Sequence, residues 1–104
     1  ISDREFKQMK SNAIVINACR GPVIDEKSLI NALDKKYITG AGLDVTEKEP
    51  IETDNPLLRM DNVIITPHLA SLTQESIKKS SQFAVENTTR VFNEEEGLSI
   101  VLPL

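Results

Sequence analysis

The sequence predicts an α/β domain organised as a three-layer, parallel sheet. Helical and extended segments alternate along the 104 residues, and no hairpin turn separates the extended ones. The run from Ala13 to Asn17 is apolar without alternation, which is typical of a strand covered on both faces. Because strands alternate with helices, neighbouring strands are expected to run parallel, joined by right-handed crossovers.

Two helices are predicted around the first strand. Ser2 and Glu5 form a capping-box pattern, and the helix that they begin is expected to end near Lys10. The strand over 13–17 follows. Asp25 is placed to cap the second helix, whose apolar stripe consists of Leu29, Ile30 and Leu33.

Two further strands are predicted in the middle of the chain. The range 39–45 contains small residues that permit close backbone packing in a second strand. A polar loop over 47–55 and a single helical turn over 56–60 come next. The third strand covers 63–66 and ends at Pro67, which cannot extend a ladder.

A long helix is predicted for the last third of the chain. Ser71 and Gln74 form a second capping-box pattern, and the helix should reach about Asn93. We expect a tail over 94–104, extended from Leu98 onward. The apolar face of the helix is expected to contain Ile77, Ala84, Val91 and Phe92.

Composition excludes several classes of function. The net charge is −4, from 12 Lys and Arg against 16 Asp and Glu, and no basic stripe predicts a nucleic-acid partner. No apolar stretch is long enough for a membrane span, no signal peptide is evident, and no metal site is expected. The single cysteine excludes an internal disulfide and fits a reducing, cytoplasmic setting. Because no Met begins the chain, we expect a piece of a longer protein.

Three ionisable residues follow the three predicted strands: Arg20, Glu49 and His68. The carboxyl ends of parallel strands lie at one edge of a sheet, where ligands bind. We therefore expect these side chains to converge. A buried guanidinium needs an anionic partner, and its two parallel donors match a carboxylate, so Arg20 is predicted to bind a small acid.

Each of these residues also has an ordinary structural interpretation. Arg20 fits a salt bridge to a helix, His68 a half-buried loop position, and Glu49 a solvated loop carboxylate. Asp44 ends a strand and needs a hydrogen-bond donor, either a backbone amide of a turn or an amide of a ligand. Cys19 has no neighbouring base and is interpreted as a packing residue.

Three separated motifs together resemble the D-isomer-specific 2-hydroxyacid dehydrogenases. They are the segment 9–25, with its Asn17–Gly21 core, the segment 40–50 and the segment 62–75. The resemblance extends to about Asn93 and is specific because the motifs occur in order at suitable spacing. It implies the second half of a Rossmann-type NAD-binding domain over 1–93.

The resemblance also implies roles for individual residues. Arg20, Glu49 and His68 would form the catalytic set: Arg20 holds the substrate carboxylate, His68 donates a proton, and Glu49 orients the imidazole. The cofactor would be NAD, with NADP not excluded, and Asp44 would accept from its carboxamide. The other expected cofactor contacts are Ala18, Cys19, Arg20, His68, Leu69, Ala70 and Ser71.

The implied function is hydride transfer between a D-2-hydroxy acid and a 2-keto acid. The chain has no Gly-x-Gly-x-x-Gly after a strand, so we expect the isolated chain to be inactive. One alternative is an NAD-sensing, co-repressor-like protein of the same fold. Another is a structural module, because half a sheet leaves an edge and an apolar face open and predicts a homo-oligomer.

Overall fold

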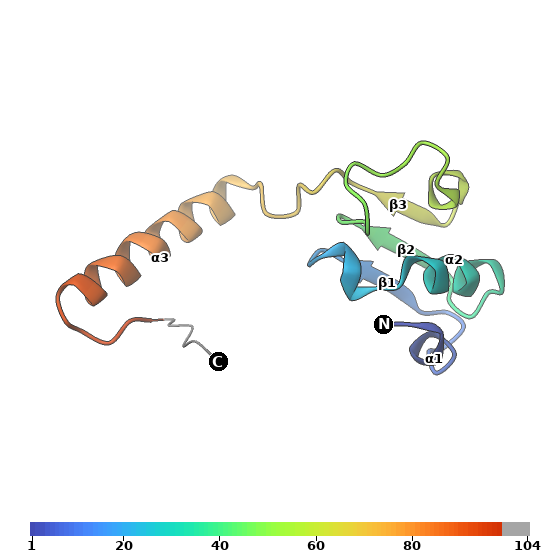
Figure 1. Ribbon diagram of the computed structural model, residues 1–104, viewed down its shortest axis with the longest axis horizontal. Coiled ribbons are helices and arrows are strands. Elements are labelled where there is room, and N and C mark those ends of the chain that lie inside the picture. The colour runs from blue at the N-terminus through green and yellow to red at the C-terminus, as the bar shows by residue number, and fades with distance from the viewer. Residues whose placement is uncertain (99–104) are drawn as a thin grey trace. The chain divides into compact units, whose positions relative to one another are not determined.

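The computed structural model describes residues 1–98, and they fall into two compact units that divide between Ala70 and Ser71. The first unit contains three parallel strands in the order β1-β2-β3 (Figure 1). The strands are β1 (Ile14–Asn17), β2 (Gly40–Leu43) and β3 (Val63–Ile65). The predicted α/β class and parallel sheet are therefore confirmed.

The register of the strands separates the two faces of the sheet. Val15 pairs with Ala41, which pairs with Val63, and the next row contains Ile16, Gly42 and Ile64. Because successive side chains point to opposite faces, the two rows lie on opposite sides of the sheet. The row that begins at Val15 faces the core.

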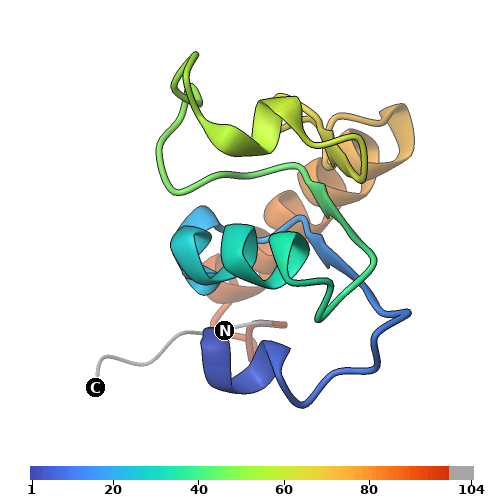
Figure 2. The ribbon, with the colours of Figure 1, turned by 90° about the vertical axis from the view of Figure 1, so that its right-hand side faces the viewer.

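Two helices cover this core-facing side. α1 (Asp3–Phe6) and α2 (Glu26–Asp34) pack against each other, and Figure 2 shows both on the same side of the strands. The side chains of Phe6 and Leu29 are almost fully buried between helices and sheet. Burial of this kind stabilises a side chain such as leucine or phenylalanine by about 1.5–3 kcal/mol.

α1 is shorter than the helix predicted to end near Lys10. Its regular part ends at Phe6, and the amides of Gln8 and Met9 bond to carbonyls only three residues back, at 3.1 and 3.2 Å. The chain thus tightens into turns once Phe6 is in the core. The cap of α2 agrees with its prediction, because the Asp25 carboxylate accepts a hydrogen bond from the Ser28 amide at 2.7 Å.

The opposite face of the sheet is open in the first unit. Ile14, Ile16 and Ile64 are 64%, 77% and 72% exposed. The expectation that the first strand is covered on both faces is therefore wrong for residues 1–70. The apolar run is present, but the helices of this unit lie on one side only, so the unit supplies the sheet and a single helical layer.

The segment after β1 packs closely on the segment after β2. A Cβ atom added to Gly21 would lie 1.9 Å from the carbonyl oxygen of Thr46, so only glycine fits. Glu47 and Glu26 add a reciprocal tie, in which each amide donates to the other carboxylate at 3.3 and 3.2 Å. The loop that follows β2 is therefore held against the beginning of α2.

The second unit contains the long helix α3 (Gln74–Phe92), and its described residues include none that is buried. Its end agrees with the prediction, whereas its start does not. Thr73, rather than Ser71, caps the helix, because its hydroxyl accepts from the Ser76 amide at 3.1 Å. The predicted tail over 94–104 is described only as far as Leu98, and the rest lies outside the described residues.

Candidate active site

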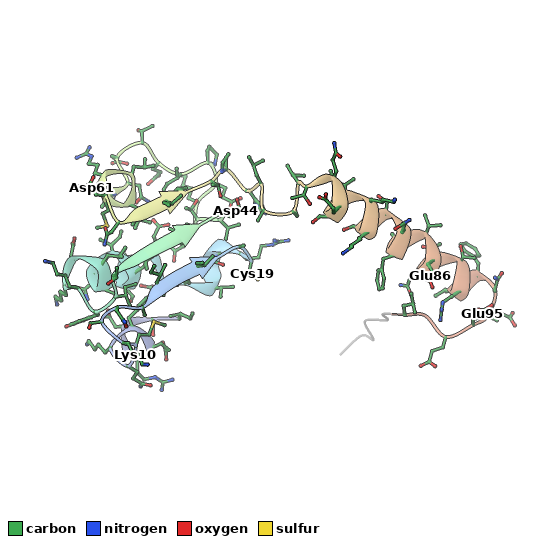
Figure 3. The ribbon with its side chains drawn as sticks, turned by 180° about the vertical axis from the view of Figure 1, so that it is seen from behind. Lys10, Cys19, Asp44, Asp61, Glu86 and Glu95 are labelled. Atoms are coloured by element: carbon green, nitrogen blue, oxygen red, sulfur yellow. The ribbon has the colours of Figure 1, made fainter. Side chains whose placement is uncertain are left out.

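The polar residues that follow the strands lie at one end of the sheet. Figure 3 shows Cys19 and Asp44 at the carboxyl ends of β1 and β2, with Lys10 and Asp61 at the opposite end. β3 runs parallel to β2, so His68 follows a strand that ends at the same edge. This edge is where open parallel sheets bind ligands.

Glu49 and His68 form a hydrogen-bonded pair at this edge. Oε2 of Glu49 lies 2.9 Å from Nδ1 of His68, and the two side chains are 40% and 47% exposed. Oε1 of Glu49 also accepts from the Thr46 amide at 3.2 Å. Glu49 is therefore held in place, unlike the solvated loop carboxylate that was considered as an alternative.

The pKa of Glu49 lies below its ordinary value, chiefly because of the hydrogen bond from His68. Partial burial opposes this shift, while the Thr46 amide and the positive charges of His68 and Arg20 add to it.

His68 has an uncommon backbone conformation, with φ of 55° in the left-handed region. Its amide donates to the carbonyl oxygens of Asp44 and Thr66, at 2.9 and 3.0 Å. The ring uses Nδ1 toward Glu49, which leaves Nε2 as the nitrogen that can meet a substrate. The loop conformation thus determines which ring atom is available.

Asp44 bonds to the backbone of the loop that contains His68. Its carboxylate accepts from the amides of Leu69 and Ala70, each at 2.8 Å, and from the Thr66 hydroxyl at 2.5 Å. These bonds lower the pKa of Asp44, and the bond from Thr66 has the largest effect. Burial opposes the shift. Of the two donors predicted for Asp44, the backbone amide of a turn is the one observed.

Arg20 is exposed rather than buried, so the expectation of a buried cation is wrong. Its Nη1 donates to the carbonyl oxygen of Cys19 at 2.7 Å, and within residues 1–98 it takes part in no ion pair. The alternative of a salt bridge to a helix is therefore not observed. The guanidinium keeps most of its donors for another group.

Asn17 is a residue of the site that the sequence reasoning missed. It is 5% exposed at the end of β1, and both ends of its amide are used. Nδ2 donates to the carbonyl oxygen of Arg20 at 2.9 Å, and Oδ1 accepts from the Cys19 amide at 3.1 Å. An asparagine just before a turn is the available signal, because its side chain bonds to the backbone two residues on.

The expected cofactor contacts are placed as follows. Ala18, Cys19 and Arg20 are exposed after β1, and Leu69 and Ala70 are exposed after β3. Cys19 is therefore not a packing residue, and that prediction is wrong. Ser71 belongs to the second unit.

A cavity of about 380 Å³ borders the Glu49–His68 pair. Its lining includes Asp44 as well as the pair, together with the apolar side chains of Ile51 and Leu58. A small molecule can therefore approach the pair.

In the described part of the chain, no group of three or more His, Cys, Asp or Glu residues could hold a metal ion. No helix in this part has the length and apolar character to cross a membrane.

Comparison with known proteins gives a consistent result. The family model described as D-isomer specific 2-hydroxyacid dehydrogenase, NAD binding domain, matches residues 1–70. The chain is 50% identical over 93 residues to a glyoxylate/hydroxypyruvate reductase B of Enterobacter, and those residues are 89% of this chain but 29% of that protein. A glyoxylate reductase of Korarchaeum cryptofilum is 44% identical over 87 residues, which are 84% of this chain and 26% of that protein.

Comparison with solved structures points to the same family. A D-isomer specific 2-hydroxyacid dehydrogenase of Xanthobacter autotrophicus, in complex with NADPH and MES, has a TM-score of 0.83 at 40% identity; the match covers 97% of this chain and 41% of that one. An NADPH-dependent glyoxylate/hydroxypyruvate reductase of Sinorhizobium meliloti has a TM-score of 0.78 at 34% identity, covering 97% and 32%. The chain thus spans less than half the length of these relatives. It belongs to the D-isomer specific 2-hydroxyacid dehydrogenase family, and its sheet is part of the Rossmann-type NAD(P)-binding domain.

Proposed function

We propose that this chain contributes Arg20, Glu49 and His68 to an oxidoreductase that interconverts a D-2-hydroxy acid and a 2-keto acid. The observation that carries the proposal is the 2.9 Å contact between Glu49 and His68 at the carboxyl edge of the sheet. Arg20 follows β1, which runs parallel to β2, and this supports the presence of a cation at the same edge. The names of the relatives support a small 2-keto acid as substrate.

Arg20 is proposed to bind the carboxylate of the substrate. The guanidinium is exposed and has donors left after its bond to the Cys19 carbonyl. Two parallel hydrogen bonds to a carboxylate would place the neighbouring carbonyl carbon in a defined position. Asn17 holds the backbone of Arg20 and thereby supports this geometry.

His68 is proposed to be the general acid of the reductive direction. Protonated Nε2 would give its proton to the carbonyl oxygen as negative charge develops there, and in the oxidative direction it would take the proton from the hydroxyl group. Glu49 would stabilise the imidazolium and keep Nδ1 protonated. The pair therefore supplies one proton per turnover in reduction, after which solvent reprotonates it, and accepts one proton per turnover in oxidation.

The cofactor is proposed to be NAD or NADP. When bound, its nicotinamide supplies the hydride for reduction or accepts it in oxidation. The exposed backbone over 18–20 and 68–70 and the Oδ2 atom of Asp44, which accepts a single bond from Ala70, fit the nicotinamide end. Ser71 remains a further proposed contact. The chain has no glycine-rich loop for the pyrophosphate, so we propose that it is inactive alone.

The test is a chimaera in which the matched 93 residues of this chain replace the corresponding segment of the Enterobacter reductase. We expect the chimaera to oxidise NADH or NADPH in the presence of glyoxylate or hydroxypyruvate and, with hydroxypyruvate, to form the D-isomer of glycerate. The unmodified reductase is the positive control. A folded chimaera that binds the cofactor without turnover would contradict the proposal and favour the NAD-sensing alternative.

Two further parts of the proposal concern the setting of the protein. The lone cysteine, Cys19, fits a reducing compartment, so we propose a cytoplasmic protein.

The open face of the sheet, with Ile14, Ile16 and Ile64, supports self-association of this chain, because a second copy would cover these side chains. Sedimentation should detect a dimer or larger species of the 104-residue chain, and a compact monomer would contradict this part.

A further inference from the structure

We propose that Asp44 is a positioning residue for His68, which acts by folding the loop 66–70 around its carboxylate. The inference rests on the proposed function, which assigns proton transfer to His68. It differs from the cofactor contact expected of Asp44, because it assigns the carboxylate a task in the protein itself.

The donors that surround Asp44 all come from the loop that contains His68. Oδ1 accepts from the Thr66 hydroxyl at 2.5 Å and from the Leu69 amide at 2.8 Å. Oδ2 accepts from the Ala70 amide at 2.8 Å. The carboxylate thus holds the loop on both sides of His68, while the main-chain oxygen of Asp44 accepts from the His68 amide at 2.9 Å.

This arrangement accounts for the backbone of His68. A φ of 55° is unfavourable for a residue with a side chain and persists only where the surroundings impose it. The charged acceptor imposes it here, because the amides of Leu69 and Ala70 can both reach Asp44 only when the chain turns at residue 68. The same turn directs Nδ1 of the ring toward Glu49.

Asp44 is itself fixed to the sheet. Its amide donates to the carbonyl oxygen of Asn17 at 2.9 Å, and the residue is 8% exposed. Asn17 in turn bonds to the backbone of Cys19 and Arg20. Hydrogen bonds therefore anchor both the loop with His68 and the loop with Arg20 to the adjoining ends of β1 and β2.

The test uses NMR spectroscopy of the 104-residue chain, in which His68 is the single histidine. Two readouts apply: the intraresidue Hα–HN NOE of His68, which is strong when φ is positive, and the ¹⁵N shifts of its ring, which report the tautomer. Asp44→Asn replaces one acceptor oxygen by an NH₂ group that faces a donor. Asp54→Asn, in an exposed turn, is the matched control.

We expect the unmodified chain and the control to show the strong NOE and the Nδ1–H tautomer. In Asp44→Asn the NOE should weaken and the tautomer should move toward Nε2–H, while the amide signals of α2 stay unchanged. A variant whose Leu69 and Ala70 amides shift while the His68 tautomer stays the same would overturn the proposal. So would unchanged spectra.

A second variant covers the case in which Asp44→Asn does not fold. Thr66→Val keeps the branched side chain and removes only the hydroxyl donor to Asp44. The same two changes at His68, smaller in size, would support the proposal, and their absence would overturn it. These readouts do not depend on turnover, so an inactive chimaera would refute the proposed function without deciding the role of Asp44.

Discussion

Oε2 of Glu49 and Nδ1 of His68 lie 2.9 Å apart, although 19 positions separate the two residues in the chain. Parallel strands cause this approach, because β2 and β3 end at the same edge of the sheet and the loop after each strand carries one partner. The contact gives each residue a property that it lacks alone: a fixed ring for His68 and a lowered pKa for Glu49.

Replacing the carboxylate of this pair should slow catalysis more than it weakens substrate binding. In the chimaera, we expect Glu49→Gln to lower kcat. The loss should not exceed the factor of about 10²–10⁴ that general acid–base catalysis contributes. The KM for the keto acid should change little, because the residue proposed to bind its carboxylate is Arg20. Glu52→Gln, an exposed residue in the same loop, is the control and should keep the kcat of the unmodified chimaera. Equal losses in the two variants would refute the role of Glu49.

The lowered pKa of Glu49 predicts how the pair responds to acid. A carboxyl group with a depressed pKa in the folded state contributes stability above its ordinary value of 4.5, and this contribution is lost as the pH falls through the folded pKa. ¹³C NMR of the Glu49 carboxyl should therefore show titration below pH 4.5. His68→Gln removes the largest cause of the shift, so the pKa should rise toward 4.5. A pKa that stays as low in this variant would contradict the assignment.

The capping box of α1 predicts a second acidic shift that is independent of the site. Bonds from the Ser2 hydroxyl and amide, both at 2.8 Å, lower the pKa of Glu5 to about 2. Ser2→Ala removes the hydroxyl donor, the largest cause, and should raise the pKa of Glu5 measured by ¹³C NMR. Thr39→Val is a control that removes an exposed hydroxyl far along the chain. A Glu5 pKa unaffected by Ser2→Ala would show that the cap does not form.

Two glycines provide a matched test of the close contact between the loops. Gly21→Ala places a Cβ 1.9 Å from the Thr46 oxygen and should destabilise the chain by about 1–3 kcal/mol or more. Gly42→Ala meets its nearest atom, on Ile16, at 3.7 Å, so it should be neutral or stabilising by about 0.5–1 kcal/mol. Urea denaturation of both variants measures the difference. Similar stabilities would contradict the packing of Gly21 on the loop after β2.

Local signals in the sequence predicted the order and type of the elements. The Asp25 cap, the apolar runs of β1 and β3 and the absence of a hairpin signal each depend on neighbouring residues, and the structure agrees with them. The helix boundaries were less predictable, because α1 ends where Phe6 enters the core. Two hydroxyl residues, Ser71 and Thr73, competed for the cap of α3.

The candidate site was predictable in outline, through the rule that parallel strands share an edge. What the rule could not provide was the neighbours of each side chain. Exposure of Cys19 and Arg20 depends on which elements cover the turn after β1. The task of Asp44 depends on backbone amides 25 and 26 positions away, which no local pattern indicates.

Proton transfer by His68 is the central claim, and single-turnover hydride transfer in the chimaera tests it most directly. With NADH or NADPH and a keto acid premixed at saturation, His68→Gln should reduce the rate by about 10²–10⁴-fold while cofactor binding persists. A variant without the imidazole that transfers hydride as fast as the unmodified chimaera would show that another group supplies the proton.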